Sequence, residues 1–432
     1  MNHDKLYHSS EKREKIAGLS LLACLLLNTT SILYFWDNDS DFFKQDFSGG
    51  DSLNTFIGGA IIVLIIPQLL SKKNEIFQLF KTSWPLILLF GFSLISCLWS
   101  QFPAVSFRRW VRLTITAVCI LNLISEPNGI NLLKKYLYSY VKITAMVSLF
   151  LITMMPQYGW HRSDGFGSLP MGFLGHKNNL GQFAAISILF LFWLKWSGFV
   201  FKKEKELKIL FVCLFVLLLI SQAKTSMGGF ILGTVTAVTY GSMRGNYKKK
   251  AVFGMLCIFV AMTFGFLFLR VNNIVNDPIY YAVELSGRDM TFTGRTDLWS
   301  SLMFLGTRMH PVLGSGYGAF FLGEQSSWLL KYLQWQAPDA HNGFLSVFLE
   351  LGFTGLGIVI FALAYNLYKI ATNRLSGKKE NAVLLGIFIF IIFFNMFEVG
   401  LMTNSLSFFT FIIISFYLAT QKCFFQKTLS TK

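Results

Sequence analysis

Two polar residues, His341 and Asn342, stand directly before a long apolar segment, "GFLSVFLELGFTGLG". A histidine with an ordinary pKa of about 6.5 is mostly neutral at pH 7, so its imidazole can accept a proton from an attacking hydroxyl group. His341 is therefore a candidate general base. On position alone, a capping or structural role suits this residue at least as well as proton transfer.

The glycines of the same segment predict how it packs. Counted as one helix from His341, eleven residues complete about three turns, so Gly352 shares the face of the histidine. Gly355 falls beside it, and small residues there would let another helix approach closely. Glu350 falls on the opposite face, at membrane depth. It is a functional candidate or half of a structural ion pair rather than a partner of His341.

Basic residues stand at the ends of other apolar segments. Arg108, Arg109 and Arg112 form "SFRRWVRL", Lys224 lies in "SQAKTSMGG", and Arg295 lies in "TGRTDLWSSLMF". Positive charge on the outer side of a membrane departs from the usual orientation rule. It favours an anionic ligand such as a phosphate, with lipid headgroups or simple solvation as the alternatives.

A further polar cluster opens an apolar segment in "GFLGHKNNLGQF", residues 172–183, with His176, Lys177 and Asn178 at its start. The free amide groups and positive dipole end of a helix N-terminus suit phosphate oxygens, although these residues also suit a plain polar cap. The sequence lacks HExxH, CxxC, GxSxG and a phosphate-binding GK[ST] loop. We therefore expect no metal and no cofactor.

Composition places these residues in a membrane. Of 432 residues, 53% are hydrophobic and 14% are charged, more apolar content than a soluble core of this size needs. The net charge of +16 falls in short blocks between apolar segments, as in cytoplasmic loops, so nucleic acid is not the expected partner. Six cysteines without a CxxC pair indicate neither a disulfide framework nor a zinc site.

The expected fold is an all-α polytopic membrane protein with about twelve transmembrane helices in one integral membrane domain, residues 1–432. The predicted spans are 16–36, 53–70, 83–99, 108–125, 136–156, 180–198, 208–222, 227–241, 250–271, 343–368, 381–397 and 404–420. The lysine and arginine pattern predicts cytoplasmic termini. It also places residues 272–341 outside, as one large extracytoplasmic loop with short amphipathic helices at "TDLWSSLMFLG" and "SSWLLKYLQW".

Six motifs together resemble one family. "HNGFLSVFLELGFTGL" fits a pattern of histidine, a small amide or hydroxyl residue, nine residues and Gly-x-x-Gly-Leu. That pattern is similar to the signature of the O-antigen ligase and Wzy-type polymerase superfamily. "WSQFPAVSFRR", "GFLGHKNNLGQ", "SQAKTS", "GRTDLW" and "FNMFEVGLMTN" follow the order of its exopolysaccharide-polymerase (ExoQ-like) branch. The resemblance covers about residues 99 to 410.

The resemblance implies a membrane glycosyltransferase in the bacterial cytoplasmic membrane, with its active site facing outward. A sugar hydroxyl would attack the anomeric carbon of an undecaprenyl-pyrophosphate-linked glycan, with inversion, and a chain-length regulator is a possible partner. By similarity His341 is the base and Arg295 binds pyrophosphate, while Lys224 stands where arginine is common. The remaining implied contacts to pyrophosphate or glycan are Arg108, Arg109, His176, Lys177, Asn178, Asn342 and Glu398.

Two other functions compete with the polymerase. A ligase would transfer the lipid-linked glycan to lipid A core or another acceptor. A non-enzymatic transporter or flippase of lipid-linked sugars would usually carry charges near the bilayer midplane and internal repeats. This sequence has few midplane charges and collects its polar candidates on the outer side, which favours an enzyme.

Overall fold

The computed structural model describes residues 2–29, 52–163, 167–201, 203–243, 295–332, 339–373 and 375–430. These residues are predominantly helical, which confirms the prediction of a helical membrane protein but not its number of spans. The predicted span 250–271 and the end of the predicted span 16–36 lie outside the described residues. So does a large part of the predicted outer loop.

The elements follow one another in a simple order. The N-terminal half contains α1 (Asn2–Thr29), α3 (Ser52–Ser71), α4 (Lys73–Thr82), α5 (Trp84–Ile95), α6 (Pro103–Ile124), α7 (Gly129–Met154), α8 (Pro156–Gly159), β1 (Trp160–Ser163), β2 (Gly167–Pro170) and α9 (Lys177–Trp196). The C-terminal half contains α10 (Glu204–Ile220), α11 (Lys224–Ser242), α14 (Arg295–Met309), α15 (Glu324–Tyr332), α16 (Gly343–Thr372), α17 (Lys378–Phe397) and α18 (Leu406–Ser430). Short 3₁₀ turns occupy residues 96–98, 172–174 and 320–322.

The predicted spans correspond closely to these helices. Each span that falls within the described residues is helical over most of its length. By length and composition, α7, α9, α16 and α17 can each cross a membrane. A fifth crossing is added if α3 and α4, bent by 93° at their junction, count as one broken span. The total of about twelve spans therefore stays a prediction.

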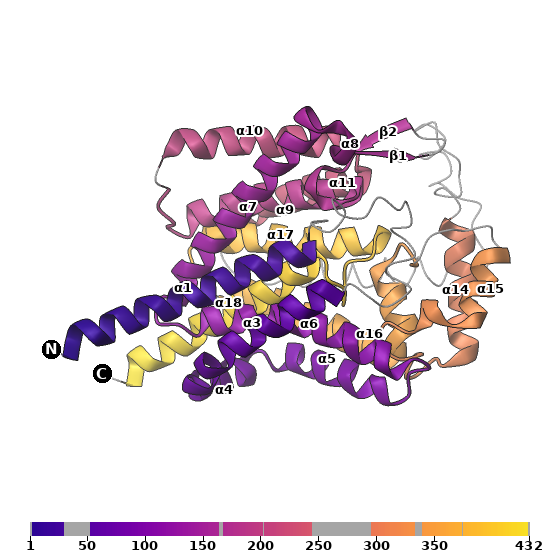
Figure 1. Ribbon diagram of the computed structural model, residues 1–432, viewed down its shortest axis with the longest axis horizontal. Coiled ribbons are helices and arrows are strands. Elements are labelled where there is room, and N and C mark those ends of the chain that lie inside the picture. The colour runs from indigo at the N-terminus through magenta and orange to yellow at the C-terminus, as the bar shows by residue number, and fades with distance from the viewer. Residues whose placement is uncertain are drawn as a thin grey trace.

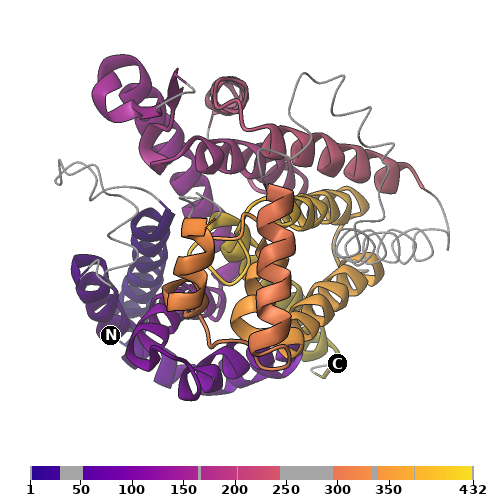
Figure 2. The ribbon, with the colours of Figure 1, turned by 90° about the vertical axis from the view of Figure 1, so that its right-hand side faces the viewer.

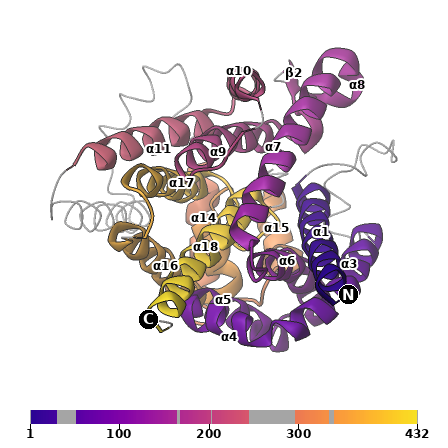
Figure 3. The same cartoon turned by 90° about the vertical axis from the view of Figure 1, so that its left-hand side faces the viewer.

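Helix α18 runs through the middle of the bundle, with α6, α9, α16 and α17 packed against it (Figure 3). Its residues 406–420 are buried almost without exception. A helix that is apolar on all sides is stable only when other helices or lipid surround it. The apolar character of "LSFFTFIIISFYLAT" thus explains why this last helix forms the core.

The two ends of the bundle differ. The beginning of α1 and the end of α18 lie at one end, whereas α14 and α15 lie at the other (Figure 1). Viewed from that second end, α14 and α15 lie in front of the other helices (Figure 2). The two short helices predicted in the outer loop are thus confirmed as α14 and α15. The side of the membrane on which they lie stays a prediction.

Close helix packing occurs at glycines other than those predicted. A Cβ atom on Gly233 of α11 would lie 2.6 Å from the carbonyl oxygen of Gly386 of α17, and one on Gly386 would lie 2.4 Å from the Gly233 oxygen. Gly229, one turn earlier, faces Phe390. Two small residues four apart are the pattern that lets membrane helices approach closely. This antiparallel contact fixes the C-terminal end of α17 beside the start of α11.

The expected role of Gly352 and Gly355 is wrong. Gly352 has φ +66° and ψ −170°, so it breaks α16 instead of packing it against a neighbouring helix. A Cβ on Gly355 would meet Leu351 of the same helix. Four backbone hydrogen bonds from residues 311–316 serve the freed groups on both sides of the break: Phe353 N to Pro311 O at 2.8 Å, Thr354 N to Val312 O at 3.1 Å, Ser315 N to Leu349 O at 3.1 Å and Gly316 N to Glu350 O at 2.9 Å.

The structure adds two details to the predicted helical fold. A short antiparallel hairpin of β1 and β2 accompanies the helices. In addition, Lys72 and Lys134, which belong to the basic blocks predicted to lie in cytoplasmic loops, are only 9% and 6% exposed. Lys72 donates to Glu126, and Lys134 donates to the carbonyl of Ser197. A buried ammonium group is tolerated because these acceptors replace water.

Candidate active site

His341 does not belong to the helix that follows it. The residue has φ +46°, a left-handed conformation that costs a non-glycine residue about 1–3 kcal/mol. Its backbone N–H donates to Oδ1 of Asp339 at 2.8 Å. Helix α16 begins only at Gly343, with Asn342 as its N-cap. The expectation that His341 lies on a face of this helix is therefore wrong. The histidine projects instead from a strained turn that precedes the helix.

Asn342 holds the beginning of α16. Its Oδ1 accepts hydrogen bonds from the N–H groups of Phe344 and Leu345, both at 3.0 Å, and the side chain is buried. Capping oxygens of this kind satisfy amide groups that have no partner inside the helix. Asn342 was expected to contact the substrate. The structure gives it a capping role that fixes where the turn of His341 joins the helix.

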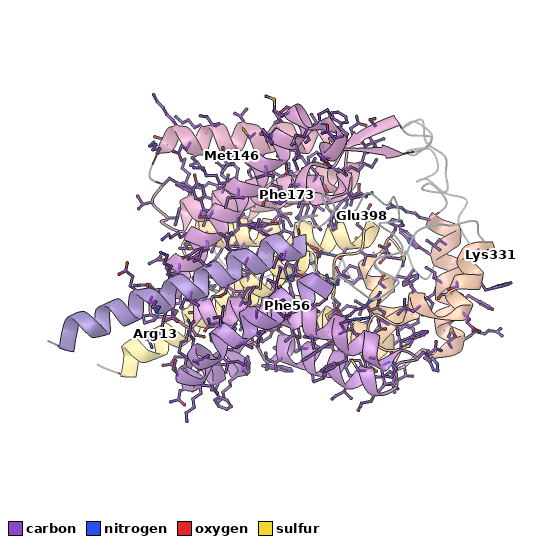
Figure 4. All side chains as sticks on the ribbon, viewed as in Figure 1. Arg13, Phe56, Met146, Phe173, Lys331 and Glu398 are labelled. Atoms are coloured by element: carbon purple, nitrogen blue, oxygen red, sulfur yellow. The ribbon has the colours of Figure 1, made fainter. Side chains whose placement is uncertain are left out.

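The carboxylate of Glu398 is the point at which distant segments meet. It follows the last residue of α17 and is 8% exposed. Oε1 accepts from Nδ2 of Asn178 at 3.0 Å and from Nη2 of Arg295 at 3.2 Å. Oε2 lies 3.5 Å from Nδ1 of His341. Figure 4 places Glu398 at the end of α17 nearest α14, far from Arg13.

Arg295 joins two parts of this site. It is the first residue of α14 and is largely buried, and its Nη1 donates to the carbonyl of Phe397 at 2.6 Å. Its Nη2 contacts Glu398, so two of the five N–H donors of a guanidinium group are engaged in these bonds. The planar guanidinium group therefore spans the end of α17 and still carries donors of the kind that bind phosphate oxygens.

Burial and two neighbouring side chains determine the charge state of Glu398. Burial raises the pKa of its carboxyl group, but the close contact with His341 and the charge of Arg295 outweigh burial and hold the pKa below its usual range. Glu398 is therefore ionised at neutral pH. A fixed negative charge thus lies beside both the histidine and the arginine.

The orientation of His341 follows from its neighbours. Nδ1 lies 3.5 Å from Glu398 and 3.6 Å from Oδ1 of Asp339. These distances exceed those of firm hydrogen bonds, as is common for catalytic contacts before substrate binds. Carboxylates on the Nδ1 side favour a proton there, which leaves the lone pair on Nε2. Nε2 is then the atom that can accept a proton.

The beginning of α9 reaches the same point. His176 is its N-cap, and Nδ1 of His176 accepts from the N–H of Asn178 at 3.2 Å. Lys177 is the first helical residue, and Asn178 donates to Glu398. The predicted helix N-terminus is therefore confirmed, and it lies at the candidate site. Whether it binds phosphate stays a prediction.

Lys224 lies at the level of this site. It is the exposed first residue of α11, which packs antiparallel to α17 with Gly233 beside Gly386. Nine residues before Gly233, Lys224 stands opposite the last turn of α17. The contact of Gly181 with Ala223 also brings it near the first turns of α9.

Arg108 and Arg109 lie in another part of the molecule, away from Glu398. They lie near the start of α6, and Nη1 of Arg109 donates to the carbonyl of Gly318. Tyr317, beside Gly318, donates through its hydroxyl to the carbonyl of Met402 at 2.7 Å. These two contacts join the segment around Tyr317 and Gly318 to α6 and to the loop that follows Glu398. The anion site expected at these arginines stays a prediction.

Sequence reasoning missed how two of these residues act, Glu398 and Trp299. Glu398 was expected to contact the substrate, whereas the structure surrounds its carboxylate with Asn178, Arg295 and His341. The bond from Nε1 of Trp299 to the carbonyl of Ala340, at 2.6 Å, was not foreseen. The only available signal was the spacing in "GRTDLW", which puts Trp299 one helical turn after Arg295.

Comparison with known families bears on the predicted superfamily. Residues 209–360 match the O-antigen ligase family. This confirms the predicted O-antigen ligase and Wzy superfamily over about a third of the chain, and with the apolar helices it indicates a multi-pass membrane protein. The ExoQ-like branch stays a prediction. No curated protein matches the chain.

The region that matches the O-antigen ligase family includes only part of the candidate site. It contains Lys224, Arg295 and His341, whereas Asn178 precedes it and Glu398 follows it. The family supports lipid-linked glycan substrates in the membrane. The expectation that no metal or cofactor takes part is not tested.

Proposed function

We propose that this protein polymerises undecaprenyl-pyrophosphate-linked oligosaccharide repeat units into a surface polysaccharide, on the outer side of the bacterial cytoplasmic membrane. The O-antigen ligase match supports a ligase or polymerase of lipid-linked glycans. The observation that carries the proposal is the convergence of His341, Arg295 and Asn178 on the carboxylate of Glu398. That arrangement combines a base, a phosphate-binding cation and a helix N-terminus.

The reaction is an inverting glycosyl transfer. The hydroxyl oxygen of the acceptor sugar attacks the anomeric carbon of the donor from the face opposite to the pyrophosphate. Its proton passes to Nε2 of His341, and the bond between the anomeric carbon and the phosphate oxygen breaks. The electron pair leaves with undecaprenyl pyrophosphate. Such a base typically contributes about 10²–10⁴-fold to the rate.

Glu398 acts through His341 in this mechanism. Its carboxylate, 3.5 Å from Nδ1, holds the tautomer that leaves Nε2 free of a proton. When Nε2 takes up the proton, the imidazole becomes a cation, and a neighbouring carboxylate stabilises that charge. Burial strengthens the effect, because the charges interact through a medium of lower dielectric constant than water. Glu398 is therefore a positioning residue.

Arg295 and the start of α9 bind the leaving pyrophosphate. The donors of Arg295 that do not contact Phe397 or Glu398 suit bidentate contact with phosphate oxygens. Lys177 and the amide groups of the first turn of α9 add positive charge, and Lys224 stands nearby at the start of α11. Pyrophosphate is already a good leaving group, so charge stabilisation replaces a general acid.

The direct test is incubation of the purified protein with a lipid-linked repeat unit, followed by gel separation of the products. The account predicts a ladder of oligomers that still carry the lipid. A single transfer to lipid A core or to another added acceptor would show the alternative, an O-antigen ligase, which the description of the matching family favours. Movement of the substrate across vesicles without any new glycosidic bond would instead indicate a transporter.

A further inference from the structure

Helix α14 contributes two side chains to the candidate site, one turn apart. Arg295 is its first residue and Trp299 follows four positions later, so both project from the same side of the helix. Each donates to a backbone carbonyl at 2.6 Å: Arg295 to Phe397, and Trp299 to Ala340. One short helix therefore contacts both the end of α17 and the turn that carries His341.

The turn at His341 depends on its neighbours, because a left-handed histidine is not a conformation that the chain prefers by itself. Asp339 accepts the N–H of His341, and the N–H of Gly343 donates to the carbonyl of Glu398 at 3.1 Å. Trp299 holds the carbonyl of Ala340. The peptide unit between Ala340 and His341 is thus held at both its oxygen and its nitrogen.

Burial makes the tryptophan contact consequential. Trp299 is 4% exposed and Ala340 is fully buried. Water therefore does not readily replace the indole N–H if that donor is removed, and a buried carbonyl without a partner favours rearrangement of the turn. Since this peptide unit leads directly into His341, such a rearrangement moves the imidazole away from Glu398.

We propose that Trp299 is a positioning residue that fixes the turn of His341 and couples the placement of this base to the docking of α14 through Arg295. This inference rests on the proposed function for its kinetic consequence. When α14 is docked, the cation for the pyrophosphate and the support of the base are in place together. Displacement of α14 removes both at once.

A purely structural tryptophan would behave differently. If Trp299 only filled a cavity, a smaller aromatic ring would lower stability and leave the turnover of folded molecules unchanged. If it fixes His341, loss of the N–H lowers turnover while donor binding persists. Trp299→Phe removes the N–H and retains an aromatic ring. Trp328→Phe, at an exposed position on α15, is the matched control.

The kinetic experiment measures kcat and KM of the purified full-length protein on a lipid-linked repeat unit. We expect Trp299→Phe to lower kcat by about 10- to 100-fold, the range for small displacements of a catalytic group, with KM within about twofold of wild type. Trp328→Phe should retain kcat. A kcat of Trp299→Phe within about twofold of wild type, or an equal loss in Trp328→Phe, would overturn the inference.

A second readout needs no turnover. Diethyl pyrocarbonate modifies accessible imidazoles, and the exposed His310 serves as an internal reference in the same protein. We expect His341 to react several-fold faster relative to His310 in Trp299→Phe. An unchanged ratio would refute the positioning role, even if kcat were lowered. If Trp299→Phe does not fold, 3-benzothienylalanine at position 299 keeps the ring shape without the N–H, and the same two outcomes apply.

If the wild-type protein forms no glycosidic bond from lipid-linked donors, the proposed function fails. The modification ratio then decides the role of Trp299 alone.

Discussion

Two buried ion pairs lie in different parts of the molecule, and their partners differ. Lys72, between α3 and α4, donates to the backbone and side-chain oxygens of Asn122, both at 2.9 Å, and to Glu126 at 2.6 Å. An ammonium group has three donors, so this lysine is saturated. Arg295 uses two of five donors in its contacts with Phe397 and Glu398, and the carboxylate it meets also faces a histidine.

The two pairs differ in whether their cation keeps N–H donors for a ligand. A saturated pair has no donor left for a ligand, and its contribution is to join helices and to fix the 93° bend between α3 and α4. The pair at Glu398 has donors that remain and a titratable neighbour. It also lies where the starts of α9 and α14, the turn before α16 and the end of α17 meet. In the sequence, charge alone did not distinguish the Lys72–Glu126 pair from the Arg295–Glu398 pair.

A large loss of activity is expected at Arg295. Arg295→Ala should reduce polymer formation by about 10²–10³-fold, because the donors that stabilise the leaving pyrophosphate are lost. Arg295→Lys should restore little activity, since an ammonium group cannot make a planar bidentate contact. Product formation is measured at equal membrane abundance. Loss of protein together with product would mean that Arg295 is structural, as Lys72 is.

The opposite result is expected at the saturated pair. Lys72→Met should lower the free energy of unfolding by about 3–5 kcal/mol, because Glu126 is left buried without its cation. The turnover of the molecules that remain folded should stay within about twofold of wild type. Lys73→Met, at the exposed neighbouring lysine, is the control for stability. A selective loss of turnover without loss of stability would break the comparison.

A smaller effect is expected at Glu398. Glu398→Gln retains an oxygen for Asn178 but removes the charge beside His341, and turnover should fall by about 10- to 100-fold. The charge also stabilises the fold. Because the folded-state pKa of Glu398 is lowered, that stabilisation is complete above the usual glutamate pKa of about 4.3 and is lost as the pH falls through the lowered pKa.

Melting temperatures measured against pH test this sign. Wild type should melt above Glu398→Gln at pH 7, and the difference should shrink as the pH falls below about 4, because wild type then becomes protonated at Glu398. The variant cannot titrate at this position, so subtraction removes the contributions of other carboxyl groups. A difference that grows on acidification would contradict the assigned charge state.

The sequence predicted the local features well. Within the described residues, the predicted apolar segments are helical with small shifts at their ends, and "GFLGHKNNLGQF" and "TDLWSSLMFLG" contain helix starts at the site. Hydrophobic periodicity and helix-start residues are local signals, and they suffice for such assignments. His341, Arg295, Asn178 and Glu398 were each named, although only the structure brings them together.

The remaining features depend on contacts between distant residues. The break at Gly352 is stable because residues 311–316 supply hydrogen bonds, and no pattern near Gly352 reveals that segment. The left-handed turn at His341 likewise depends on Asp339 and Trp299. Lys72 looked like a loop charge because its partner Glu126 lies 54 residues away. Burial and pairing of this kind are set by tertiary packing.

The most direct test of the account is the loss of the base. His341→Ala is compared with His310→Ala, which alters an exposed histidine just after α14, at matched protein levels and with melting curves. The account predicts that His341→Ala lowers polymer formation by about 10²–10⁴-fold, leaves the melting temperature near that of wild type and lets single lipid-linked repeats accumulate. Polymerisation by His341→Ala at more than about a tenth of the wild-type rate would contradict the assignment of His341 as general base.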